Sequence, residues 1–190
     1  MKLSTITGTF SNENVELSRE QDGEKFYLYT LTIEDGLEIR AQVSEYLEVP
    51  IGVPVEVTGC LSSCKRFSEE RGRSAMFTFF EAKLITTLGD NYNPSKRIEC
   101  SGTVTHIYNM TLTRGGTEKV TIVVRERQGK NHIGIVHYTA MGKLARQLVS
   151  TLRKGDSVDG YGMLRKKTES FEVLLSELTI IHNQEVNNYE

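Results

Sequence analysis

The chain contains two related segments, and this internal repeat constrains its fold more than any other feature. Residues 4–87 and 98–181 read as two copies of one β-rich unit. A repeat of this kind predicts two similar domains, and it lets each copy serve as a comparison for the other. The clearest matches pair TITGTF (5–10) with ECSGTV (99–104), EKFYLYTL (24–31) with EKVTIVVR (118–125), and GVPVEVTGCL (52–61) with GDSVDGYGML (155–164).

Strand signals dominate both copies. In the second copy, apolar residues recur at every second position from Val120 to Val124, which predicts a strand with one buried face. Gly115-Gly116 indicates a turn before this strand, and Asp22-Gly23 and Asp35-Gly36 indicate turns around the related strand of the first copy.

A helix is expected in the second copy only. Leu144, Leu148 and Leu152 recur at helical spacing, with glycines on either side, which predicts a helix that packs its leucine face on a barrel. In the first copy, Pro50 and Pro54 leave room for one turn at most.

Five short strands with a helix between the third and the fourth are typical of the OB-fold barrel. The sequence therefore predicts an all-β protein of two tandem five-stranded OB-fold barrels, the second with a short helix between strands three and four. The expected boundaries are residues 1–88 for the N-terminal barrel, 89–97 for a linker, 98–182 for the C-terminal barrel and 183–190 for a flexible tail.

Charge is divided unequally between the copies. Up to residue 93 the chain has 9 Lys and Arg against 15 Asp and Glu, a net charge of −6; the remainder has 14 against 10, a net charge of +4. The basic second copy is therefore the better candidate for binding a polyanion, and the two copies are expected to differ in function.

Few signs of catalysis or metal binding are present. No phosphate-binding loop, nucleophile elbow or paired-carboxylate pattern stands out, so the chain is not expected to be an enzyme. Cys60 and Cys64 are separated by roughly 13 Å on an extended strand and no second ligand pair follows, so no metal or other cofactor is expected. With Cys100 they number three, which favours free thiols and a cytoplasmic location.

The segment from Tyr138 to Lys167 resembles the bacterial and phage single-stranded DNA-binding proteins. The similarity lies in three motifs in the family's order: Gly-Lys-Leu-Ala (142–145), Lys-Gly-Asp (154–156) and Gly-Met-Leu-Arg (162–165). The resemblance implies an OB-fold without catalysis that binds single strands along strands two and three and the hairpin loops. On those strands it implies contacts from Arg125, Arg127, Ile135, His137 and Met141. The family usually stacks bases on tryptophans, whereas this chain has none, and Ile135 and Met141 stand where rings would be expected.

Binding of a single strand requires cations near phosphates and flat groups under bases. The candidates in the second copy are Arg114, Lys119, Arg125, Arg127, Lys130, His137, Tyr138, Arg165, Lys166, Lys167 and Phe171. In the first copy, Arg40 and the loop residues Lys65, Arg66, Phe67, Arg71 and Arg73 are candidates for a second contact site.

Tyr27, Tyr29, Leu31 and Ile33 are expected on the outer face of the first barrel, where the aligned positions of the second copy include Arg125 and Arg127. Exposed apolar residues of this kind need a partner. Either the tyrosines form a stacking platform, or the face packs on another subunit or on the second barrel. Burial is slightly favoured, since Leu31 and Ile33 offer nothing to a base.

Together these patterns predict a cytoplasmic protein that binds single-stranded DNA with little sequence preference in replication or recombination, with a phage or plasmid as one candidate source. RNA is an alternative ligand. A homodimer with four barrels is expected, and no membrane association. The competing hypothesis is an adaptor whose barrels bind proteins without direct contact to nucleic acid, because one fold supports many functions.

Overall fold

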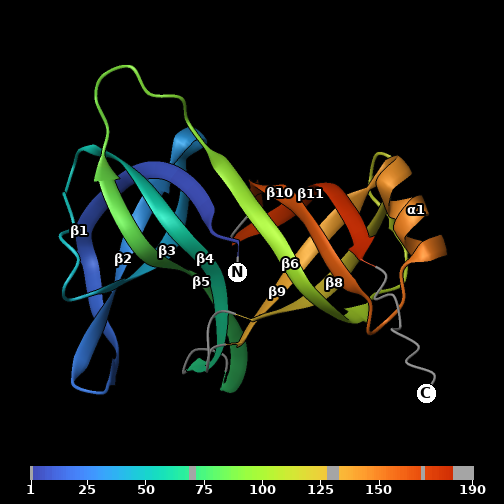
Figure 1. Cartoon of the computed structure of the whole chain (residues 1–190), viewed down its shortest axis with the longest axis horizontal. Helices are drawn as coiled ribbons and strands as arrows, with labels where there is room; N and C mark the ends of the chain where they lie inside the picture. The colour runs from blue at the N-terminus through green and yellow to red at the C-terminus, as the bar shows by residue number, and fades with distance from the viewer. Residues whose placement is uncertain (1, 69–71, 128–132, 168–169, 182–190) are drawn as a thin grey trace, which may run out of the picture.

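The computed structural model describes residues 2–68, 72–127, 133–167 and 170–181, and within them it shows two β-barrels side by side (Figure 1). The predicted tail, 183–190, lies outside the described residues. The first barrel contains β1 (Ser4–Gln21), β2 (Glu24–Ile33), β3 (Leu37–Ser44), β4 (Pro54–Ser68) and β5 (Arg73–Thr87), with the short 3-10 turn η1 (Glu34–Gly36) between β2 and β3. The second contains β6 (Lys96–Ile107), β7 (Thr111–Leu112), β8 (Glu118–Arg127), β9 (Ile133–Met141), α1 (Gly142–Thr151), β10 (Ser157–Lys167) and β11 (Ser170–Ile181).

Each barrel closes in the same way. In the first, the strand order β2-β3-β5-β4-β1 is closed by pairing of β1 with β2; in the second, β8-β9-β11-β10-β6 is closed by pairing of β6 with β8. The third and fifth strands run parallel, joined at Ala41–Phe80 and Gln42–Glu81 in one barrel and at Tyr138–Val173 and Thr139–Leu174 in the other. The predicted all-β fold of two OB barrels is therefore confirmed.

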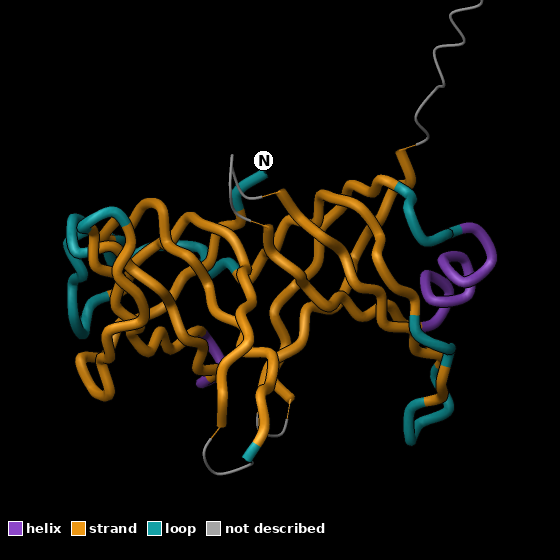
Figure 2. The backbone as a smooth tube through the Cα atoms, turned by 90° about the horizontal axis from the view of Figure 1, so that it is seen from below, coloured by secondary structure: helices purple, strands orange, loops and turns teal. Residues whose placement is uncertain are grey.

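The predicted helix is also confirmed. Helix α1 buries Ala145, Leu148 and the following Leu152 against the second barrel. It lies at the end of the molecule that is remote from the first barrel (Figure 2). Between β3 and β4 of the first barrel, the described residues form turns and no helix.

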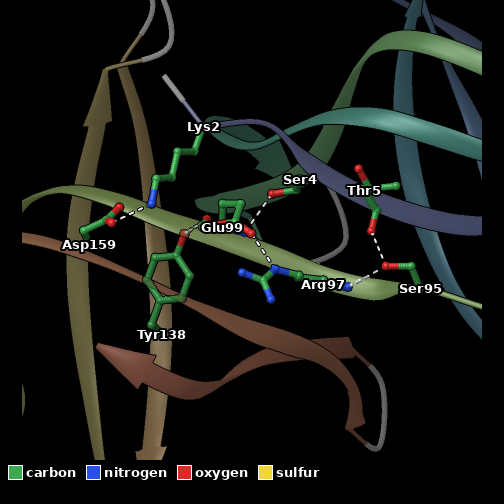
Figure 3. Close-up of polar contacts among 8 residues, drawn as sticks. All are labelled: Lys2, Ser4, Thr5, Ser95, Arg97, Glu99, Tyr138 and Asp159. Carbon is green, nitrogen blue, oxygen red and sulfur yellow. Dashed lines mark hydrogen bonds and ion pairs between the residues drawn. The ribbon is translucent and has the colours of Figure 1, made fainter. Parts of the chain in front are cut away.

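The two barrels share one sheet. Strands β1 and β6 pair antiparallel at Thr5–Arg97 and Ile6–Lys96, which joins the barrels through their first strands. Polar contacts reinforce this junction: the Glu99 N–H donates to Ser4 Oγ at 2.9 Å, and the Ser95 hydroxyl donates to the Thr5 carbonyl at 2.8 Å (Figure 3). Strand β5 ends at Thr87 and β6 begins at Lys96; the predicted limits of the two domains and their linker remain predictions.

The structure corrects the alignment of the repeat in the second strand. A Cβ on Gly8 would meet the Thr32 carbonyl oxygen at 2.6 Å, and a Cβ on its repeat partner Gly102 would meet the Arg125 carbonyl oxygen at 2.4 Å. Thr32 therefore corresponds to Arg125, one position away from the pairing that the sequence match suggested. Because side chains alternate between faces of a strand, a slip of one residue exchanges the inner and outer faces.

The predicted apolar outer face of the first barrel is consequently wrong. Leu31 and Ile33 are buried in the barrel core, and Tyr29 packs against that core with its ring edge-on to Phe10 at 5.9 Å. Tyr27 shares their face of β2, opposite the buried Val43. Leu31, Ile33 and the partly buried Tyr29 therefore pack in the interior of their own barrel and form neither a stacking platform nor a subunit contact, whereas Tyr27 is half-buried.

Candidate functional site

The outer face of β8 and β9 carries the side chains that the resemblance pointed to. Lys119 lies opposite Met141, and Arg125 lies opposite Ile135, across the antiparallel pair. Lys119 and Met141 are half-buried, while Arg125, Ile135 and His137 are exposed. The second barrel therefore places cationic and apolar side chains on one open surface.

A hollow of about 580 Å³ lies over this surface. Its walls come from the loop after β6, from β7, from β8 and β9, and from the β10–β11 hairpin. Four predicted residues, Lys119, His137, Lys167 and Phe171, line it, together with Tyr108, Asn109, Thr111, Thr121, Thr139 and Glu172.

Aromatic rings gather at one side of the hollow. The Tyr108 ring lies edge-on to the His106 ring at 4.5 Å and tilted to the His137 ring at 6.2 Å. His106 of β6 and His137 of β9 both pair with Val123 of β8, which lies between them. The strand register therefore places the two histidines at the same level across the sheet. Burial, with a smaller effect of the nearby His106, lowers the pKa of His137 and favours its neutral ring. A neutral imidazole beside an exposed phenol is a suitable surface for stacking a base.

The charges of the hollow are mixed. Lys119 forms an ion pair with Glu172 at 3.1 Å, and the Thr139 hydroxyl donates to the same carboxylate at 3.3 Å. Burial raises the pKa of Glu172, but the bond and charge of Lys119 and the bond from Thr139 outweigh it, so the net pKa is lowered. Glu172 therefore neutralises Lys119 in this structure, and Lys167 is the remaining cation among the described residues that line the hollow. Arg125 lies on the same strand as Lys119, outside that lining.

The predicted basic triplet does not act as one group. Lys167 lines the hollow, whereas the Lys166 ammonium donates to the Gly36 carbonyl of the first barrel at 3.2 Å. Arg165 is exposed, with one guanidinium nitrogen 3.7 Å from Met141 Sδ. Successive side chains of a strand point to opposite faces, so Lys166 lies on the face of β10 opposite to that of Arg165 and Lys167.

Tyr138 is not a surface residue, which corrects its prediction as a binding residue. It is fully buried, and its hydroxyl donates to the Glu126 carboxylate and lies 3.1 Å from the Glu99 carbonyl oxygen. Burial raises the pKa of Glu126 to about 7, against the lowering effect of its bonds from Tyr138 and the Ser101 backbone. Burial likewise keeps the pKa of the Tyr138 phenol well above its usual value. This pair belongs to the core of the barrel.

The remaining predicted residues divide into three groups. Arg114 is exposed in the turn before β8, outside the lining of the hollow. Arg40 of the first barrel donates to Thr30 Oγ1 at 3.1 Å and to the carbonyls of Asn14 and Leu28, so its guanidinium is fixed on its own barrel. Arg71 and Lys130 lie outside the described residues, as do the side chains of Lys65, Arg66, Phe67, Arg73 and Arg127.

The sequence analysis did not select five residues that line the hollow: Asn109, Thr111, Thr121, Thr139 and Glu172. It also did not select His106, which lies outside the lining and contacts the Tyr108 ring. The nearness of His106 to His137 depends on the register of three strands, which the repeat did not give reliably. Among the described residues, no three or more His, Cys, Asp or Glu side chains come together to hold a metal ion, and all three cysteines are free. None of the described helices has the length and apolar character needed to cross a bilayer.

Similar proteins were found by fold and not by sequence. No protein-family model and no curated protein sequence matches the chain. The structure superimposes with a TM-score of 0.73 and 18% identity on a deletion mutant of the single-stranded DNA binding protein from Thermus aquaticus, covering 100% of this chain and 98% of that chain. For the wild-type Thermus aquaticus protein the TM-score is 0.71 at 18% identity, covering 96% and 94%. The resemblance expected from the sequence is thus confirmed in the fold, and the chain is built along its whole length like a single-stranded DNA-binding protein with two OB barrels.

Proposed function

We propose that this protein binds single-stranded DNA in the hollow on the outer face of β8 and β9. The observation that carries the proposal is the combination, in that one hollow, of the Tyr108, His137 and Phe171 rings with Lys119 and Lys167. Rings accept any base by stacking and cations follow the phosphates, so this composition suits a single strand better than a folded protein partner.

Sequence-independent binding follows from the same chemistry. Base stacking at Tyr108 and Phe171 uses the ring face, which every base has, and Lys167 supplies charge without reading a base edge. The function is therefore binding without a chemical step, in processes such as replication or recombination in the cytoplasm. RNA is the alternative ligand under the same chemistry. The predicted homodimer of four barrels remains a prediction and rests on the family resemblance alone, since Leu31 and Ile33 fill the core.

The proposal is tested by titrating fluorescently labelled oligo-dT into the full chain at low and moderate salt, with a duplex of equal length as control. We expect binding to oligo-dT, a clear preference over the duplex, and affinity that falls steeply as salt rises, because phosphate contacts release counterions. No binding at low salt, or equal affinity for the duplex, would contradict the proposal.

The same titration locates the phosphate contacts. Replacing Arg125 and Lys167 with alanine should flatten the slope of log K against log salt by about 0.7 for each phosphate that is no longer neutralised. The matched control replaces Lys143 in α1 and Lys154 after it, two exposed lysines outside the hollow, and should leave the slope unchanged. Equal slopes for both pairs would place the phosphate path elsewhere.

A further inference from the structure

A second hollow, of about 380 Å³, lies between the two barrels. The first barrel contributes Arg40 from β3 and Met76 and Phe77 from β5. The second barrel contributes His137 from β9 and Phe171 and Glu172 from β11. Its volume falls within the range of small-ligand sites, and a single nucleobase fits such a space.

The hollow forms where the third and fifth strands of each barrel separate, and where these two separated parts face each other. In each barrel the parallel ladder between the third and fifth strands joins only two residue pairs among the described residues, Ala41–Phe80 and Gln42–Glu81 in the first and Tyr138–Val173 and Thr139–Leu174 in the second. Ahead of these pairs the strands separate. Arg40 and Phe77 lie on this separated part in one barrel, and His137 and Phe171 lie on it in the other. Figure 1 shows β4 and β9 approaching each other between the barrels, and the two strands are in contact.

This hollow adjoins the hollow of the second barrel. His137, Phe171 and Glu172 line both hollows, so their side chains separate two neighbouring compartments instead of closing one site. A strand that stacks on Tyr108 and His137 therefore reaches the first barrel by passing Phe171.

The first-barrel wall has the chemistry to hold a base. Phe77 stacks on the ring of the buried Phe79, with centroids 5.9 Å apart and planes at 25°, which fixes the orientation of its ring. Met76 is 47% exposed on the same strand, a flexible thioether beside a ring. Hydrogen bonds to Thr30 and Asn14 hold the positively charged Arg40 at this wall. Glu38 on the same wall and Glu172 on the facing wall carry the opposite charge. The wall is thus more apolar than cationic, which favours a base over a phosphate.

We propose that the hollow between the barrels is a second base-binding site that carries one nucleic-acid strand from the second barrel onto the first. The inference rests on the proposed function, since it extends the same bound strand. It assigns the first barrel a direct role in binding through Met76 and Phe77 of β5, despite its net negative charge.

The test compares oligo-dT of two lengths on the full chain carrying Met76→Ala and Phe77→Ala together. OB-folds cover roughly 4–16 nucleotides each, so dT of ~5 nucleotides occupies the second barrel and dT of ~30 nucleotides can span both. The removal of the one stacking ring, Phe77, should raise Kd for the long oligonucleotide by about 5-fold to 150-fold and leave Kd for the short one unchanged. Leu84→Ala, on the same strand, 56% exposed and outside both hollows, is the control and should behave as wild type.

The outcomes separate the two proposals. Suppose that wild type binds oligo-dT, and that the double variant binds the long oligonucleotide more tightly than the short one by the same factor as wild type. The proposed site between the barrels is then wrong, and the proposed function stands. If wild type binds neither length at low salt, both are wrong. Thermal unfolding checks that the double variant is folded. If it is not, the single variants Met76→Ala and Phe77→Leu replace it, and each should weaken binding of the long oligonucleotide only. Wild-type affinity for the long oligonucleotide in both single variants would overturn the inference.

Discussion

Replacement of Tyr108 by alanine is expected to raise Kd for oligo-dT by about 5-fold to 150-fold, because one base stack contributes roughly 1–3 kcal/mol. Tyr108 is 47% exposed at the mouth of the hollow and contacts the rings of His106 and His137, so the substitution removes the centre of the ring cluster without opening the core. Equilibrium binding at fixed salt measures the effect.

Two further variants identify the cause. Tyr108→Phe keeps the ring and should bind within about 3-fold of wild type if stacking is the contact; a loss as large as that of the alanine variant would assign the effect to the hydroxyl instead. Tyr92→Ala removes a tyrosine of similar exposure, 38%, from the segment between β5 and β6, and should leave Kd unchanged. Wild-type affinity in Tyr108→Ala would exclude the ring cluster as the binding surface.

Glu126→Gln should make the protein more stable than wild type at pH 8, by on the order of 3 kcal/mol, and the difference should shrink to about 1 kcal/mol at pH 5. Burial raises the pKa of Glu126 to about 7 in the folded chain, whereas the ordinary value is 4.5. The folded state therefore binds more protons than the unfolded state between these two values. The stability that this group contributes is fully present below pH 4.5, is lost as pH rises to about 7, and changes little above that.

Urea unfolding at several pH values, followed by far-UV circular dichroism because the chain has no tryptophan, measures this effect. Wild type should lose stability relative to Glu126→Gln as pH rises from 5 to 7.5. Glu48→Gln, which neutralises an exposed glutamate, is the control and should run parallel to wild type. A constant difference between wild type and Glu126→Gln at all pH values would show that Glu126 does not titrate in this range.

The first barrel explains why Glu126 is unusual. With the corrected register, Glu126 occupies the position of Ile33, which is buried in the core of the first barrel. Tyr138 occupies the position of the small Ala41, and its hydroxyl reaches the carboxylate. The second copy has thus replaced an aliphatic contact by a buried hydrogen-bonded pair, which costs stability when the carboxylate is ionised.

The fold was predictable because its signals are local, and the strand and turn signals occur in both copies. The leucine spacing from Leu144 to Leu152 predicted the helix, and the turn residues at Asp22-Gly23 matched the β1–β2 turn, where both have positive φ. The faces of β2 were not predictable in the same way. The sequence match placed Glu24 with Glu118, and the true register differs by one residue, as the contacts of Gly8 and Gly102 and the strand pairing show.

Only part of the binding surface was predictable, because contacts between strands and between the two copies are not visible in the sequence. Lys119, His137, Lys167 and Phe171 follow from strand alternation and hairpin position within one copy. Tyr138 was misassigned because the sequence of its strand gives no indication that a buried carboxylate on the neighbouring strand accepts its hydroxyl. The hollow between the barrels depends on the pairing of β1 with β6, a contact between the copies that neither repeat shows alone.

The most direct test of the central claim is to map where a single strand lies on the protein. Oligo-dT carrying photoreactive thymine should be cross-linked to the full chain at low salt and the attached peptides identified by mass spectrometry. The account predicts attachment at Tyr108 and Phe171, and its loss when unlabelled oligo-dT is added in excess. Attachment confined to the opposite surface, such as Tyr161 beneath Arg97 on the outer face of β6 and β10, would contradict it.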